Sequence, residues 1–229
     1  MESLRGDQSM ADPTDLDTLR DRVEVILADT GNAIWATGDV DAAIRQALAE
    51  YSKIRPFHTE DTITASEDTH ELDGSTELAA AIDVTRVWCP YTSTAPEDPP
   101  SWVGFEFWRD DECILYLPGG ILNGETARVF FDIPQALGGL DSASTTTLPA
   151  EDWELVATGA AGYAAMSRAL DLGEQVTLDR DVPQKAKTWA GQKLQEFRQG
   201  LAAVARAQAL QGKSHVPLPR LDRHDSTWS

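Results

Sequence analysis

The chain has 229 residues, of which 41% are hydrophobic and 25% charged, and its formal net charge is −19 at pH 7. This length supports one domain, or two small ones, with a real buried core. The two cysteines, Cys89 and Cys113, exclude a disulfide framework, and an acidic body excludes attraction to duplex DNA phosphates.

The N-terminal region lacks the features of an export signal. It includes Glu2, Arg5 and Asp7 instead of a basic stretch followed by an apolar run, which predicts a protein that is not exported by a cleaved signal. Residues 1–13 are polar and without period, so we expect a disordered tail there. The least polar stretch, 155–166, is too short and too rich in Gly and Ala to cross a bilayer, so no membrane partner is expected.

Charge is unevenly distributed along the chain. Residues 184–229 hold eight Lys or Arg against three acids, a local charge of +5, which leaves −24 for the preceding residues. The basic segment is suited to an acidic partner surface. The alternative interpretation is a solvated acidic surface with a basic helix facing water.

Two helices are predicted within residues 14–55. Apolar residues recur at helical spacing after a cap at Thr14 or Asp15. A second helix follows, in which Asp39 is placed to accept the first free amide hydrogens, and Pro56 ends it. We expect these two helices to form an antiparallel pair.

The apolar period then changes to that of strands, and residues 60–135 are predicted to form a β insertion. Isolated apolar residues in an acidic run come first. Strand patterning is then clear in four stretches: 82–89, 103–107, 113–117 and 129–133. Asn123-Gly124 is typical of a tight turn, which predicts that the last two of these strands form a hairpin. We expect a small antiparallel sheet of about four strands.

Helical period returns at Pro149 and predicts two further helices within residues 149–210. The first contains internal glycines, each costing about 1 kcal/mol relative to alanine. We therefore expect its small surface to let another backbone approach closely, and we assign contacts between copies in an oligomer to Gly159, Ala160, Gly162 and Ala164. The second helix has apolar residues that form a seam for another helix, within the chain or between chains: Ala190, Leu194, Phe197, Leu201 and Val204.

Residues 211–229 alternate prolines with apolar residues and cannot continue the last helix. They predict an extended C-terminal arm that becomes ordered on a partner. The residues assigned to partner binding are Val216, Pro217, Leu218, Pro219, Arg220, Leu221 and Trp228. The whole pattern predicts an α+β fold, in which a single domain over 14–210 is a helical bundle of about four helices with a small antiparallel β-sheet insertion.

The sequence contains no recognisable catalytic constellation. His58 and His70 lie near acidic residues, which keeps a metal-dependent enzyme as one alternative, although neither cluster matches a known ligand spacing. Cys89 has no motif residue that would place a base beside it. A second alternative is a binding module whose aromatic strand face takes a carbohydrate or another protein, with these candidates: Trp88, Trp102, Phe105, Phe107 and Trp108.

Two sequence motifs flank the β segment. Residues 39–56 read DVDAAIRQALAEYSKIRP, and residues 149–165 read PAEDWELVATGAAGYAA. They resemble the ALxxYSxxRP helix end and the LxxxGAAGYAA-like helix of the head-to-tail adaptor (connector) proteins of tailed bacteriophages. The resemblance covers about residues 15–210, including a final helix at 189–206.

The resemblance implies a structural virion protein without enzymatic activity, metal or cofactor. Such a protein is made in the host cytoplasm and forms a homo-oligomeric ring, a dodecamer, at the neck between head and tail. Its partners would be the portal protein, which the arm would bind, and the tail or next connector. Duplex DNA would pass through the ring without specific binding, because an acidic wall gives no counterion release.

Overall fold

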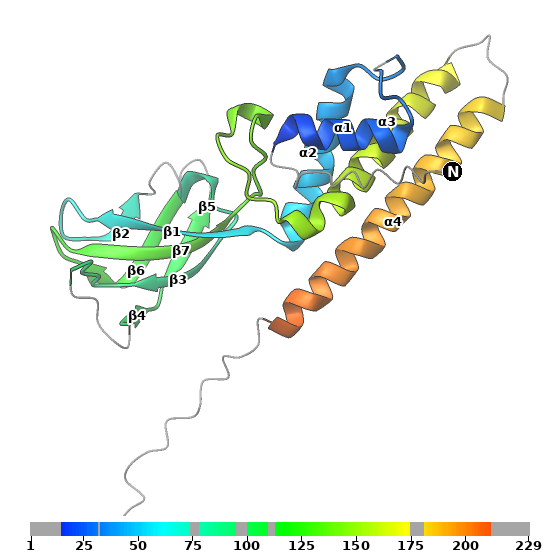
Figure 1. Ribbon diagram of the computed structural model, residues 1–229. Helices are drawn as coiled ribbons and strands as arrows, with labels where there is room; N and C mark the ends of the chain where they lie inside the picture. Colours follow the sequence, from blue (N-terminus) through cyan, green and yellow to red (C-terminus); the bar gives the residue numbers. More distant parts are fainter. Residues whose placement is uncertain are drawn as a thin grey trace, which may run out of the picture.

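The computed structural model describes residues 15–31, 33–73, 78–94, 100–109, 113–174 and 181–211. The predicted tail over 1–13 and the arm beyond Gln211 lie outside these residues. The described chain forms four α-helices: α1 (Leu16–Leu27), α2 (Thr37–Ile54), α3 (Trp153–Glu174) and α4 (Asp181–Gln211). Short 3-10 turns lie at Leu78–Ala80, Leu140–Ser142 and Ala150–Asp152. Figure 1 shows the helices on one side of the molecule and the strands on the other, so the predicted α+β class is confirmed.

The starts of α1 and α2 are fixed by carboxylates. The amide nitrogen of Thr18 donates to Asp15 at 3.0 Å, which confirms Asp15 as the cap of α1. The second helix begins at Thr37, two residues before the predicted cap. Asp39 instead reaches back and accepts from the amide nitrogen of Ala36 at 3.3 Å, the reciprocal half of a capping box.

Asp29 organises the connection between α1 and α2. Its side chain is buried and accepts from three successive backbone amides, those of Ala33 (3.0 Å), Ile34 (2.8 Å) and Trp35 (3.0 Å). These hydrogen bonds hold the pKa of Asp29 below its ordinary value, and the one from the Trp35 amide has the largest effect. The connection therefore has a fixed shape, which places Trp35 against α3.

The centre of the helical half is α3, which contacts each of the other three helices. In Figure 1, α1 lies across α2, so the predicted antiparallel pairing of these two helices is wrong. Both instead bury their apolar faces on α3, in a core that includes Leu19, Ile44, Val156 and Phe197. The reason is that α3 offers small buried residues on several sides, so it accommodates helices at different angles.

The strands form two antiparallel sheets instead of the single sheet that was expected. The four-stranded sheet has the order β1-β7-β3-β4, and its strands are β1 (Phe57–Thr64), β7 (Thr126–Ile133), β3 (Asp83–Trp88) and β4 (Trp102–Val103). The three-stranded sheet has the order β2-β6-β5, and its strands are β2 (Thr69–Asp73), β6 (Cys113–Ile121) and β5 (Glu106–Arg109). Apolar residues of both sheets share one core, which includes Leu115, Leu117, Val129 and Phe131.

The turn at Asn123-Gly124 joins the two sheets. Gly124 has a φ of +82°, and the amide of Glu125 donates to the carbonyl of Leu122 at 2.9 Å, as the sequence predicted for a tight turn. The strands on either side do not pair, however, because β6 pairs with β2 and β5 whereas β7 pairs with β1 and β3. The predicted hairpin is therefore wrong, and the turn instead carries the chain from one layer of a β-sandwich to the other.

Candidate interaction surfaces

A buried polar junction connects the two halves of the molecule. Tyr51 is fully buried near the end of α2, and its hydroxyl donates to the Asp152 carboxylate at 2.5 Å. Arg55 donates to the same carboxylate at 2.5 Å. Burial, and then the hydrogen bond to Asp152, raises the pKa of Tyr51, so the phenol stays protonated. Asp152 thereby ties the end of α2 to the start of α3.

The strand that leaves the sandwich is held at the same junction. Ser52 accepts from the amide nitrogen of Gln135 at 3.0 Å and donates to the Leu48 carbonyl at 2.6 Å. The side-chain amide of Gln135 donates to the Arg55 carbonyl at 2.9 Å. Both connections to the sandwich are therefore fixed to the end of α2, the helix end whose residues carry the first of the two motifs.

The second motif lies where α3 meets α4. A Cβ placed on Gly159 would lie 2.8 Å from the Phe197 ring, and one on Gly162 would lie 2.9 Å from the Leu194 side chain. Ala160 and Ala164 are also buried in the same core. The close approach that the sequence predicted thus occurs within the chain, along the predicted seam of α4. A single chain does not test a contact between copies through these four residues.

The predicted partner-binding residues, Val216 to Leu221 and Trp228, lie outside the described residues. The described part of α4 ends in exposed turns. Leu210 is 85% exposed and Arg206 is exposed, whereas Leu201 is buried. The last turns of α4 are therefore more exposed than the part of the helix that packs on α3.

The aromatic residues of the insertion are divided between locations. Trp102 is 47% exposed on the outer face of the four-stranded sheet, and Trp108 is 45% exposed on the outer face of the three-stranded sheet. Phe105 and Phe107 pack against the sandwich core, and Trp88 is buried beside Tyr91 and Trp102. The five candidates therefore do not form one platform.

On the outer face of the four-stranded sheet, several charged residues have partners. Arg128 pairs with Glu60 and lies over the rings of Tyr91 and Phe130. His58 contacts Asp132. Arg86 lies 5.5 Å from the centre of the Trp102 ring, beside a shallow hollow of about 600 Å³. This face offers a neutralised aromatic surface.

The outer face of the three-stranded sheet is acidic and aromatic. The ring centres of Trp108 and Tyr116 are 5.5 Å apart in a stack, and His70 also stacks with Tyr116, at 5.9 Å. Tyr116 lies in register between Glu71 of β2 and Glu106 of β5, both exposed. No cation pairs with Glu71 or Glu106 among the described residues.

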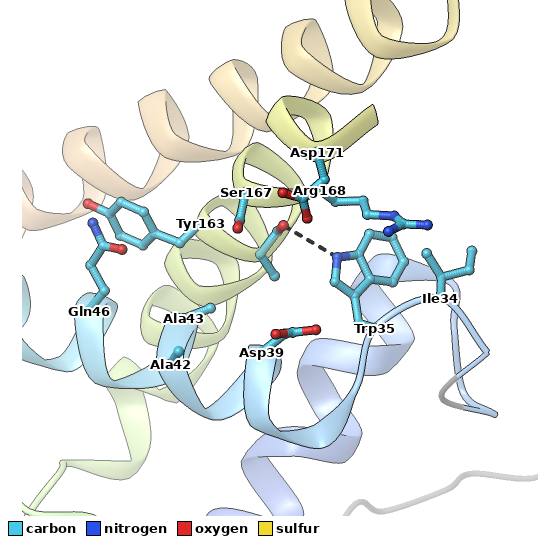
Figure 2. A pocket seen from close by; sticks show the side chains of 11 residues that line it. Ile34, Trp35, Asp39, Ala42, Ala43, Gln46, Tyr163, Ser167, Arg168 and Asp171 are labelled. Atoms are coloured by element: carbon cyan, nitrogen blue, oxygen red, sulfur yellow. Dashed lines mark hydrogen bonds between the residues drawn. The ribbon is translucent and has the colours of Figure 1, made fainter. Parts of the chain in front are cut away.

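A small polar pocket lies between α2 and α3 (Figure 2). It has a volume of about 170 Å³, and its polar residues are Asp39, Gln46, Ser167, Arg168 and Asp171. The indole nitrogen of Trp35 donates to the carbonyl of Ala164 at 3.3 Å, so Trp35 closes one end by binding α3. The pocket contains no histidine or cysteine, and its carboxylates come from separate helices.

The groups proposed for catalysis or metal binding are not assembled into a site. Burial raises the pKa of the Cys89 thiol, which disfavours a thiolate nucleophile. His70 contacts the carbonyl of Leu117, and Asp68 accepts from the amide of Asn123. Within the described ranges, no three His, Cys, Asp or Glu residues are placed to hold a metal ion. None of the described helices combines the length and the hydrophobicity of a membrane span.

Comparison with known proteins gives matches among solved structures alone. No protein-family model and no curated protein matches the chain. A chain from the neck of an empty GTA particle, computed with C6 symmetry, is similar at 13% identity and a TM-score of 0.29, covering 76% of this chain and 87% of that one. A chain from the neck of a native GTA particle, computed with C12 symmetry, is similar at 15% identity and a TM-score of 0.28, covering 79% and 91%. At such scores the superpositions carry no argument about function, which rests instead on this chain's own residues.

Proposed function

We propose that this chain is a structural virion protein, a head-to-tail adaptor that forms a ring between the portal and the tail or next connector. The observation that carries the proposal is the position of the two motifs that resemble the adaptor family. Tyr51, Ser52 and Arg55 of the first motif bind Asp152 and Gln135, while Gly159 and Gly162 of the second receive α4. Both motifs thus build the frame that holds the helices and the sandwich together, which is a structural task.

The charge of the molecule suits a channel for DNA. Residues 57–135, which include the sandwich, hold sixteen acids and three arginines, a formal charge of −13. A wall of this charge attracts no phosphate and releases no counterions, so duplex DNA would slide past it without binding. The proposal therefore includes a homo-oligomeric ring, a dodecamer in the adaptor family, that lines the channel of the neck.

The proposal is tested by reconstitution with the neighbouring virion proteins. Purified chain is mixed with portal rings, and complexes are separated by size and examined by native mass spectrometry. Stoichiometric rings of this chain on the portal are expected. A chain that binds neither the portal nor the next connector, and is missing from purified particles, would contradict the adaptor assignment.

The arm has its own test within the same experiment. We propose that Val216 to Leu221 and Trp228 bind the portal, since apolar residues between prolines lose little entropy on ordering. Removing residues 212–229 should leave the unfolding midpoint unchanged and abolish portal binding. Unchanged portal affinity would refute the role of the arm and leave the ring proposal intact.

A carbohydrate- or protein-binding module remains a second candidate, favoured by Trp102. Its exposed ring borders the hollow of about 600 Å³ on the four-stranded sheet, with Arg86 over it. Flat exposed rings of this kind bind sugar faces and apolar side chains. Binding to a glycan array that is lost in Trp102→Ala and kept in Trp108→Ala would support this function.

A further inference from the structure

The two outer faces of the sandwich differ in how their charges are satisfied. On the four-stranded sheet, Arg128 pairs with Glu60, and His58 contacts Asp132. On the three-stranded sheet, Glu71 and Glu106 flank Tyr116 without a paired cation among the described residues. Two exposed acids beside the exposed Trp108 ring are suited to a basic partner, because a Lys or Arg can pair with the carboxylates and lie over the indole.

The chain itself provides one basic surface. Helix α4 carries five Lys or Arg against two acids, and it is the only described helix or strand with a net positive charge. Lys185, Lys187 and Arg206 are exposed and have no ion pair among the described residues. Between them the exposed residues include Gly191, Gln195 and Ala202, together with Arg198 and with Glu196, which pairs with Lys193. With 31 residues at 1.5 Å each, this surface is about 46 Å long.

The buried side of α4 is already occupied. Leu194 and Phe197 pack on α3, and Lys193 is paired with Glu196 at 2.7 Å. A partner therefore meets the exposed sides of the helix. Arg206 lies on the side opposite Leu194 and Phe197, whereas Lys187 lies on a flank, about 100° around the helix axis from Arg206. Because each copy carries a net charge of −19, two copies repel one another except where surfaces of opposite charge meet. The basic face of α4 and the acidic face of the three-stranded sheet are such a pair.

We infer that the exposed face of α4 in one copy docks on the outer face of β2-β6-β5 of the next copy. This inference rests on the proposed ring and names its contact surface. The contact joins two different patches, so it is heterologous, and repetition of one such contact closes a ring when the rotation between copies permits. Trp108, the exposed ring of the stack with Tyr116, would receive a basic side chain, and Glu71 and Glu106 would pair with basic residues beside it.

Zero-length cross-linking tests the contact directly. Equal amounts of ¹⁴N- and ¹⁵N-labelled chain are mixed at low ionic strength, treated with a carbodiimide and digested. Mixed-isotope peptides that join Lys185 or Lys187 to Glu71 or Glu106 are expected. A chain that remains monomeric at low salt, or mixed-isotope peptides that join other surfaces only, would overturn the inference.

Charge reversal provides a matched comparison. Lys187→Glu should weaken self-association by about tenfold, since an interfacial attraction becomes a repulsion. Lys53→Glu changes an exposed lysine of α2 in the same way and should leave self-association unchanged. The double variant Lys187→Glu/Glu106→Lys exchanges the two charges and should restore association. If Lys187→Glu and Lys53→Glu weaken self-association equally, the effect comes from the net charge of the chain alone, and the proposed contact is refuted.

The outcomes separate this inference from the adaptor assignment. If Lys187→Glu still forms rings on the portal with unchanged affinity, the α4 contact is wrong and the adaptor function stands. If the chain binds no portal but self-associates through α4, the adaptor function is wrong and the contact stands. Association through this surface should also weaken as salt is raised, because exposed charge pairs are screened.

Discussion

The helical half and the β-sandwich bury their cores with different residues. Where α3 meets α4, glycines of α3 receive Leu194 and Phe197, so side chains of one helix contact the backbone of the other. The sandwich instead fills its core with larger residues such as Leu115, Leu117 and Phe131, and places aromatic and charged residues outside. The contact between α3 and α4 therefore has no room for added atoms, whereas the outer sheet faces are free to serve as binding surfaces.

The largest effect is expected for an added methyl group in the helical interior. In Gly162→Ala the new Cβ would lie 2.9 Å from the Leu194 side chain and 3.1 Å from the Leu194 amide nitrogen. Because a backbone atom cannot rotate away, we expect a loss of about 3 kcal/mol in the free energy of unfolding. Urea titration followed by circular dichroism measures it.

Gly191→Ala is the control for that substitution. Nothing lies within 4 Å of a Cβ at position 191, on the exposed face of α4. The same change should therefore stabilise the helix by about 0.5–1 kcal/mol. Equal effects at the two glycines would mean that α3 and α4 are not in close contact.

The junction between the halves should be the next most sensitive site. Asp152→Ala leaves the buried Tyr51 hydroxyl and Arg55 without their shared acceptor, and we expect a loss of about 2 kcal/mol. Asp141→Asn removes the charge of an exposed pair with Arg45, keeps a residue that tolerates the left-handed backbone at φ +50°, and should cost at most about 1 kcal/mol. Equal unfolding midpoints would mean that Asp152 does not tie the end of α2 to the start of α3.

The connection between α1 and α2 should respond to acid. The pKa of Asp29 is lowered on folding, so its contribution to stability is present above the pKa of an unfolded Asp, about 4, and is lost as pH falls through the lower folded value. Asp29→Asn should therefore be less stable than wild type at pH 7, and the difference should shrink toward pH 2. Asp21→Asn, at an exposed position of α1, is the comparison. A difference that grows in acid would contradict this assignment.

The smallest effects should separate the two outer faces of the sandwich. Glu60→Gln removes the partner of Arg128 and should cost about 0.5–1 kcal/mol. Glu106→Gln removes an acid without a paired cation and should change stability by less than about 0.5 kcal/mol. A double-mutant cycle with Arg128→Ala measures the coupling between Glu60 and Arg128. A loss of stability for Glu106→Gln as large as that for Glu60→Gln would remove the distinction between the faces.

The sequence predicts the parts of this fold that depend on local period. The caps and apolar stripes locate the helices, and the spacing of Leu194, Phe197 and Leu201 reveals the seam of α4. The sequence could not predict the pairing of β1 with β7, because the two strands are about 70 residues apart. In addition, β1 lacks a clear apolar side, since the side that includes Ile63 also includes Asp61. Two sheets therefore replaced the single sheet that was expected.

The junction was also missed, for the same physical reason. Tyr51 and Asp152 are ordinary residues within a helix and before one, and neither has a spacing that identifies the other as its partner. Only the motif resemblance indicated that the end of α2 and the start of α3 have a structural role of their own. Asp29 carried a weak signal, a lone acid just after a helix, which is a common position for binding free amides of the following turn.

The chain enters the sandwich at Phe57 and leaves it at Ile133, and these two residues are directly opposite each other in the β1–β7 ladder. Arg55, two residues before Phe57, accepts a hydrogen bond at its carbonyl from the side chain of Gln135, two residues after Ile133. The insertion therefore has a narrow neck, so a short linker could close the gap if the whole sandwich were excised. A related protein could equally carry a different module at this point without a change in the order or packing of its helices. The insertion is therefore the natural place for such proteins to diverge.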